Sequence, residues 1–154
     1  MLFLLKLIVA LAVIILGLGF FRSWQVENSD NGKLFASSTA PTVKLDGFYK
    51  GSVNTPVKVT WLGKKFIAAS SSGINIFDDG AGGTREGYPF KTFMGLNGSS
   101  TALYIDYDLP DNPFWARSIL DELVQTAPDQ YLVKLTLRII PGYPLSLGFF
   151  KLQK

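Results

Sequence analysis

The sequence predicts an all-β domain, an antiparallel sandwich or barrel, preceded by one N-terminal transmembrane helix. Two observations support this prediction. The first is an apolar run over residues 2–21 that only Lys6 interrupts. The second is a series of short segments from Val43 onward, separated by turn residues, in which apolar and polar side chains alternate as in half-buried strands. We therefore divide the chain into an anchor (1–22), a flexible linker (23–42) and a β-domain (43–154).

The apolar run is long enough to cross a bilayer. A helix that spans a hydrocarbon core of about 30 Å needs roughly 20 residues, and Lys6 lies near one end, where its side chain reaches the headgroups. Phe20, Phe21 and Trp24 form an aromatic collar of the kind found at membrane surfaces. The alternative is a cleaved secretory signal, but Gly17, Leu18 and Gly19 make a poor cleavage site.

We expect a single-pass protein whose partner is the lipid bilayer, through residues 2–21. By analogy with signal anchors that have short N-terminal tails, we place the β-domain on the extracytoplasmic side. Residues 23–42 are rich in Ser, Asn, Asp and Gly and have no helical or strand period, which predicts a flexible linker. Leu34 and Phe35 are its apolar pair and are candidates for docking on the domain.

The missing residue types exclude several classes of function. The chain has no cysteine and no histidine, which excludes disulfides, thiolate or imidazole metal sites, catalytic thiols and a Ser-His-Asp triad. The net charge is +3, and Lys64 and Lys65 form the one basic pair, so no nucleic-acid surface is indicated. We assign no catalytic residue, no metal site and no cofactor, and we identify no protein partner.

The β-domain contains about nine candidate strands. The first spans 43–53. The clearest pair, 119–126 and 131–140, flanks a turn and predicts a hairpin whose second strand has Tyr131 and Val133 on one face and Lys134 on the other. Asn112 and Pro113 resemble a helix start and predict a short helix over 113–118. Turns or loops are expected at Pro56, at Gly63 and Lys64, and over 71–73, 78–87, 95–100 and 141–144.

These features resemble a known fold family. Gly47, Phe48 and Tyr49 in the first strand, the up-and-down strands and the late Arg138 resemble the lipocalin (calycin) barrels, in which a Gly-x-Trp motif packs near a late basic residue. Segments 112–122, 131–138 and 147–150 are similar to an uncharacterised bacterial family of small, membrane-anchored, lipocalin-like proteins. The resemblance covers roughly 43–154. It implies an antiparallel up-and-down barrel of about eight or nine strands that binds a small apolar molecule inside.

Two sets of side chains are candidates for a specific role. The predicted hairpin places either Asp121 or Glu122 on the face that Lys134 and Arg138 share. This predicts ion pairs, either buried inside the barrel or in a solvent-facing charge ladder, and we favour a structural role over contact with a ligand carboxylate or phosphate. That set is Arg117, Asp121, Glu122, Lys134 and Arg138. The candidates for ligand contact are aromatic or basic: Tyr49, Trp61, Tyr104, Trp115, Lys134 and Arg138.

Two further segments allow more than one interpretation. Asp106, Asp108 and Asp111 form a D-x-D-x-x-D run, which we interpret as turn chemistry in preference to a metal site. Phe114 and Trp115 are candidates for a lid over the barrel or for contact with the membrane beside the anchor.

The leading hypothesis is a membrane-anchored, lipocalin-like protein that binds a small hydrophobic or amphipathic ligand at the cell envelope. The first alternative is a non-enzymatic structural or interaction module whose barrel is filled by side chains. The second is an enzyme that uses carboxylates, lysine or tyrosine, for which the sequence shows no converging pair of groups.

Overall fold

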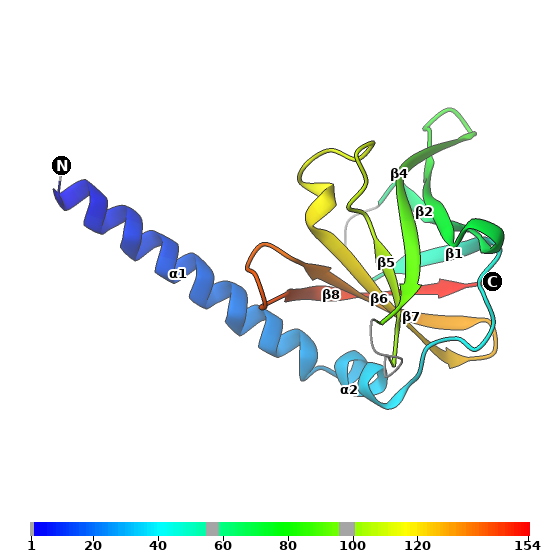
Figure 1. Ribbon diagram of the computed structural model, residues 1–154, viewed down its shortest axis with the longest axis horizontal. Coiled ribbons are helices and arrows are strands. Elements are labelled where there is room, and N and C mark those ends of the chain that lie inside the picture. Colours follow the sequence, from blue (N-terminus) through cyan, green and yellow to red (C-terminus); the bar gives the residue numbers. More distant parts are fainter. Residues whose placement is uncertain (1, 55–58, 96–100) are drawn as a thin grey trace.

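A computed structural model of the chain describes residues 2–54, 59–95 and 101–154. Within these residues it confirms the predicted fold class, because eight antiparallel strands joined in sequence order close into a barrel behind a long N-terminal helix (Figure 1). The strands are β1 (Gly47–Val53), β2 (Trp61–Ile67), β3 (Ser72–Asp78), β4 (Thr84–Met94), β5 (Leu103–Asp106), β6 (Ile119–Ala127), β7 (Gln130–Leu137) and β8 (Leu145–Gln153). The helices are α1 (Leu2–Glu27) and α2 (Asp30–Ser37), with the 3-10 turns η1 (Ala68–Ser70) and η2 (Ala116–Ser118).

The β6–β7 hairpin forms as predicted. Its two strands pair from Ile119 opposite Leu137 to Ala127 opposite Gln130. Asp129 closes the turn in the left-handed conformation (φ 58°), which aspartate tolerates better than most residues. Because side chains alternate along a strand, one face of the hairpin lines the interior of the barrel and the other lies on its outer wall.

Two apolar clusters hold the fold together. The first lies in the barrel interior, and burying each large side chain there contributes about 1.5–3 kcal/mol. Its members include Leu45, Tyr49, Phe66, Phe90, Ile105, Leu123, Tyr131, Val133 and Leu152. The second lies on the outer wall, where Phe35 of α2 packs against Val124, Leu132 and Phe149. The predicted docking of the 34–35 pair is therefore confirmed for Phe35.

The segment 23–42 differs from the irregular linker that its composition predicts. Helix α1 continues to Glu27, and α2 begins after Ser29, whose Oγ accepts a hydrogen bond from Gly32 N at 3.1 Å. Thr39 then forms an isolated bridge with Gln125 of the barrel. Contacts of Phe35 and Thr39 with the barrel hold this segment in place, and its local sequence pattern does not reveal them.

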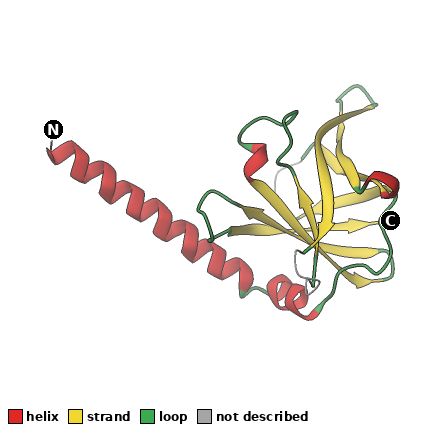
Figure 2. Ribbon diagram, viewed as in Figure 1, coloured by secondary structure: helices red, strands yellow, loops and turns green. Residues whose placement is uncertain are grey.

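Helix α1 is fixed to the barrel over its last turns. Ser146 N donates a hydrogen bond to Ser23 Oγ at 2.9 Å, and the Ser146 hydroxyl donates to the Glu27 carboxylate. Lys134 Nζ lies 3.4 Å from Glu27 Oε1. The rest of the helix projects away from the barrel (Figure 2). Among the described residues, the helical stretch Lys6–Glu27 is long and apolar enough to span a membrane.

Several predicted boundaries differ from the structure. The first strand begins at Gly47, and β4 begins at Thr84, which shortens the glycine-rich loop. The predicted helix over 113–118 is the single turn η2, and the predicted turn at Gly63 and Lys64 lies inside β2. The turn predicted at Pro56 and most of that predicted over 95–100 lie outside the described residues.

Candidate ligand site at the open end of the barrel

Lys64 lies in the barrel interior and is only 2% exposed. A β-bulge between Trp61 and Gly63 shifts the register of β2, so Trp61 and Lys64 both face inward although they are three residues apart. Gly63 has φ 148°, a region that only glycine adopts readily, and a Cβ atom there would clash with the Tyr49 carbonyl oxygen. The turn predicted at this point is therefore wrong, because the glycine serves a bulge within a strand.

Hydrogen bonds to the Lys64 ammonium group organise a polar cluster of Lys64, Asn75, Tyr107 and Asp121, here the Lys64 cluster. Nζ lies 3.0 Å from both Asp121 Oδ2 and Asn75 Oδ1, and it also donates to the Tyr107 hydroxyl. Tyr107 donates to Asp121 Oδ2 at 3.0 Å, and the Trp61 indole donates to Asn75 Oδ1 at 3.0 Å. These contacts occupy the N–H bonds of the ammonium group, so it has none left for an anionic ligand.

Aromatic rings surround the same ammonium group. The ring centroids of Trp61, Phe90, Tyr107 and Phe150 lie 4.9 to 5.7 Å from Nζ, within the range of cation–π attraction. Burial lowers the pKa of Lys64, while the adjacent Asp121 carboxylate opposes that change. Burial also raises the pKa of Tyr107 well above its usual value, and the charge of Asp121 acts in the same direction. Tyr107 therefore remains a neutral donor at physiological pH.

The Lys64 cluster forms the inner wall of a pocket of about 250 Å³. Most of its lining is apolar or aromatic and includes Val53, Phe77, Tyr88, Trp115, Ile119 and Leu135. Asp121 is 1% exposed, and its Oδ1 atom has no hydrogen-bond partner among the described residues. An unpaired buried acceptor costs about 1–3 kcal/mol, so a molecule that donates a hydrogen bond to Oδ1 would recover much of that energy.

The segment between β5 and β6 borders the mouth of the pocket. Trp115 of this segment contacts Tyr88 edge to face, with ring centroids 5.4 Å apart. Asn112, predicted to cap a helix, is instead buried, and its Nδ2 donates to the carbonyl oxygens of Pro89 (2.8 Å) and Tyr107 (2.7 Å). These bonds tie the segment to the barrel beside the pocket. We refer to this end of the barrel as the open end.

The predicted ligand contacts divide between the two ends of the barrel and its outer wall. Trp61 and Trp115 line the pocket. Tyr49 lies in the packed cluster at the opposite end, where its ring contacts Phe66 and Tyr131 edge to face. The late basic residue beside Tyr49 is Lys154, whose Nζ lies 4.8 Å from the ring centroid, and not Arg138.

The other predicted ligand contacts lie outside the barrel interior. Tyr104 stacks on the partly exposed Phe93, with ring centroids 5.4 Å apart. Lys134 lies on the outer wall beneath the helices, with its Nζ 4.8 Å from the Phe35 ring centroid. Arg138 lies just beyond the end of β7 and pairs with Asp106. The structure does not bring these three predicted residues to the pocket.

The residues predicted to form ion pairs are all paired: Lys134 has one of its two expected partners, whereas Arg138 and Asp121 have others. Lys134 pairs with Glu122 at 3.3 Å, on the outer wall and not inside the barrel. Asp121 points the opposite way and pairs with Lys64, because adjacent strand residues face opposite sides. The remaining pairs are Arg117 with Asp108 at 2.6 Å and Arg138 with Asp106 at 2.5 Å. Within the described residues no acidic group is arranged to hold a metal ion.

Sequence reasoning missed the roles of Lys64, Asn75 and Tyr107. Lys64 follows a glycine, a pattern typical of a turn, and Asn75 alternates with apolar neighbours, a pattern typical of a solvent-facing strand residue. A usable signal was the spacing of Lys64 and Phe66. Two residues apart in a strand, they share a face, so a buried Phe66 implies an inward Lys64.

Comparisons with known proteins support the fold. No protein-family model and no curated protein matches the sequence. The crystal structure of a protein from Thermomonospora curvata is similar, with a TM-score of 0.57 over 79% of this chain and 83% of that chain, at 15% sequence identity. A similarity at this identity shows the barrel architecture and assigns no function.

Proposed function

We propose that this protein is a membrane-anchored, lipocalin-like barrel that binds one small, mostly apolar molecule carrying a hydroxyl or similar hydrogen-bond donor. The observation that carries this proposal is that a mostly apolar pocket is lined by Asp121, whose Oδ1 atom has no hydrogen-bond partner among the described residues. Apolar walls with a few placed polar groups are the usual composition of a small-molecule site.

The volume of the pocket limits the size of the ligand. Drug-sized molecules occupy sites of about 300–1,000 Å³, whereas benzene fits an apolar cavity of about 150 Å³. A pocket of about 250 Å³ therefore suits a single ring with a short substituent.

The charges around the pocket favour a neutral ligand. The Lys64 ammonium group already donates to Asp121, Asn75 and Tyr107, so it is poorly placed to bind a carboxylate as well. The Asp121 carboxylate would repel an anion at the same place. We therefore expect alcohols and phenols to bind better than acids of equal size.

Three probes of similar size test this selectivity: 4-ethylphenol, ethylbenzene and 4-ethylbenzoate. The full chain is reconstituted in lipid nanodiscs, and binding is followed by the thermal midpoint of barrel unfolding. We expect the phenol to bind about tenfold more tightly than ethylbenzene, because one hydrogen bond to a charged acceptor contributes about 1.5 kcal/mol or more. The benzoate should bind most weakly.

A matched pair of variants locates the binding. Ile119→Phe adds volume inside the pocket and should abolish the phenol effect. Ile67→Phe makes the same change at an exposed position of β2 outside this pocket, so it corrects for partition of the probe into lipid. If no probe shifts the midpoint, or if Ile119→Phe responds like Ile67→Phe, the pocket is not the site and the structural-module alternative takes precedence.

A further inference from the structure

We propose that the open end of the barrel rests on the surface of the bilayer that α1 spans, with a rim of apolar side chains in the interfacial layer. The rim consists of Phe114, Trp115, Ile139 and Tyr143. This inference depends on the membrane-spanning role of α1 in the proposed function and is independent of what the pocket binds.

The β7–β8 loop lies beside α1 at the end of the apolar run. Tyr143 of this loop contacts Phe20 edge to face, with ring centroids 6.4 Å apart. Gly19 faces Leu145, the first residue of β8. Phe20 lies at the end of the apolar run 2–21, so in a spanning helix it lies at the lipid–water boundary. Tyr143 must then lie at the same depth.

The barrel is attached directly to the last turns of α1. Beyond Phe20, α1 is tied to the wall by Ser23 and Glu27, through Ser146 of β8 and Lys134 of β7. No flexible linker separates the anchor from the barrel, because α1 is continuous to Glu27. The barrel therefore keeps one face toward the bilayer.

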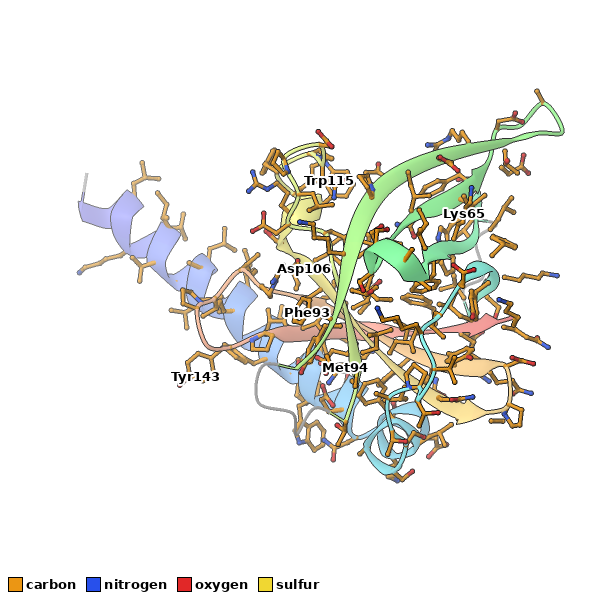
Figure 3. The ribbon with its side chains drawn as sticks, turned by 45° about the vertical axis from the view of Figure 1, so that its right-hand side comes forward. Lys65, Phe93, Met94, Asp106, Trp115 and Tyr143 are labelled. Atoms are coloured by element: carbon orange, nitrogen blue, oxygen red, sulfur yellow. The ribbon has the colours of Figure 1, made fainter. Side chains whose placement is uncertain are left out.

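The face toward the bilayer is the open end of the barrel. Ile119, which lines the pocket, pairs with Leu137, and Leu137 pairs with Leu145, so the β7–β8 loop borders the same end of the barrel. Arg138 N donates to Ser118 O at 2.8 Å, which joins this loop to the β5–β6 segment. Trp115 and Tyr143 both lie on the side of the barrel toward the N-terminal part of α1 (Figure 3).

The chemistry of the rim suits a lipid interface. Phe114 is 85% exposed and Tyr143 is 64% exposed, and Trp115 and Ile139 are each more than half exposed. Aromatic side chains partition to the headgroup level of bilayers. The nearby Arg117 and Arg138 are neutralised by Asp108 and Asp106. We therefore expect apolar insertion with little dependence on the charge of the headgroups.

This placement gives the pocket a route to the lipid phase. An apolar molecule dissolved in the bilayer would reach Trp115 and the pocket without crossing water. The occupant of the rim is the bilayer itself, and the pocket ligand is a separate question that the phenol titration addresses.

Single cysteines test the depth of the rim, because the natural chain contains none. Phe114→Cys and Tyr143→Cys report on the rim. Val43→Cys, an exposed apolar position flanking β1 away from the open end, is the matched control, and Leu11→Cys marks the middle of the apolar run 2–21. Each variant of the full chain carries a polarity-sensitive fluorophore and is reconstituted in pure phosphatidylcholine vesicles, which contain no other protein.

We expect positions 114 and 143 to be quenched by a nitroxide near the lipid headgroups and to show roughly threefold less quenching by aqueous iodide than position 43. Position 11 should respond to a nitroxide deep in the acyl chains. If positions 114 and 143 behave like position 43 while position 11 lies deep in the bilayer, the proposed contact of the rim with the bilayer is wrong, but the proposal that α1 spans the membrane is retained. If position 11 is aqueous, the spanning helix is wrong and the inference fails with it. A contact that forms only with anionic lipid contradicts apolar insertion.

Discussion

At the residue scale, the buried ion pair of Lys64 and Asp121 is the main electrostatic interaction in the barrel interior. Both side chains are almost fully buried, and removing each ion from water costs several kcal/mol. The hydrogen bonds from Lys64 to Asn75 and Tyr107 and the surrounding aromatic rings offset much of that cost. The pair together contributes little net stability, but either ion alone would be strongly destabilising.

Removing one member of the pair should therefore be far worse than removing both. We expect Lys64→Met to lower the free energy of unfolding by about 3–5 kcal/mol, and addition of Asp121→Leu to restore most of the loss. Urea unfolding followed by tryptophan fluorescence measures both. Lys65→Met is the control, because Lys65 forms a half-exposed pair with Glu86 and should cost about 1 kcal/mol or less. Equal effects of the two lysine substitutions would show that the buried pair is unimportant.

Tyr107 should make the barrel sensitive to alkali. Its pKa is raised well above the ordinary value of 10.0, so above pH 10 the unfolded chain loses this proton while the folded chain keeps it. The unfolded state then binds fewer protons, and the free energy of unfolding falls as the pH rises. The lowered pKa of Lys64 has the opposite effect: below pH 10.5 it makes the free energy of unfolding rise with pH. This effect is present in both the natural protein and a Tyr107→Phe variant, so it largely cancels when the two are compared. Tyr107→Phe should show a shallower fall above pH 10, and parallel curves would contradict this assignment.

At the element scale, the bulge in β2 determines which side chains reach the pocket. Without the extra residue, Trp61 and Lys64 would face opposite sides of the wall. Gly51 of β1 is also required, because a Cβ atom there would clash with the Trp61 ring. Gly51 and the bulge residue Gly63 therefore position the Trp61 indole and the Lys64 ammonium group side by side.

Substitution of Gly63 tests this role of the bulge. We expect Gly63→Ala to destabilise the barrel by at least about 2 kcal/mol, because it combines backbone strain with a clash against the Tyr49 carbonyl. Gly148→Ala in β8 is the matched control, since open space surrounds that position, and it should be neutral or slightly stabilising. Thermal unfolding measures both, and similar midpoints for the two variants would argue against the bulge.

The elements differ in how well the sequence predicts them. The β6–β7 hairpin is predictable because strict alternation flanks a recognisable turn. The bulge is not, because Gly63 before Lys64 satisfies the pattern of a turn equally well. Helix α2 is also not predictable from the sequence, since it depends on the packing of Phe35 against Val124 and Leu132 and not on a periodic pattern of its own. The candidate site was predicted only where aromatic residues, Trp61 and Trp115, reached the pocket.

At the scale of the whole molecule, the chain combines a barrel with an apolar interior cluster, a pocket at its open end and a helix fixed to its wall. Apolar composition predicted the helix, and strand spacing predicted the barrel. Their relative placement was not predictable, because it depends on contacts such as that between Ser146 and Glu27, which are 119 residues apart. Such contacts leave no local signature in the sequence.

The side of the membrane that the barrel occupies can be measured with one variant. We expect Val43→Cys to react with a membrane-impermeant maleimide in intact cells as completely as after lysis, because the domain is proposed to be extracytoplasmic. Leu11→Cys should stay unlabelled in both conditions, since it lies within the apolar run. Labelling of position 43 only after lysis would place the barrel in the cytoplasm.

In the proposed membrane-anchored arrangement, the direct attachment of α1 to β8 would link the site to the thickness of the bilayer. A spanning helix that is longer than the surrounding hydrocarbon layer accommodates the mismatch by tilting. Because Ser23 and Glu27 hold the barrel to this helix, the barrel tilts with it and the rim changes its angle to the surface. Lipid composition would thus adjust how deeply Phe114 and Tyr143 reach into the bilayer, without any change in the pocket itself.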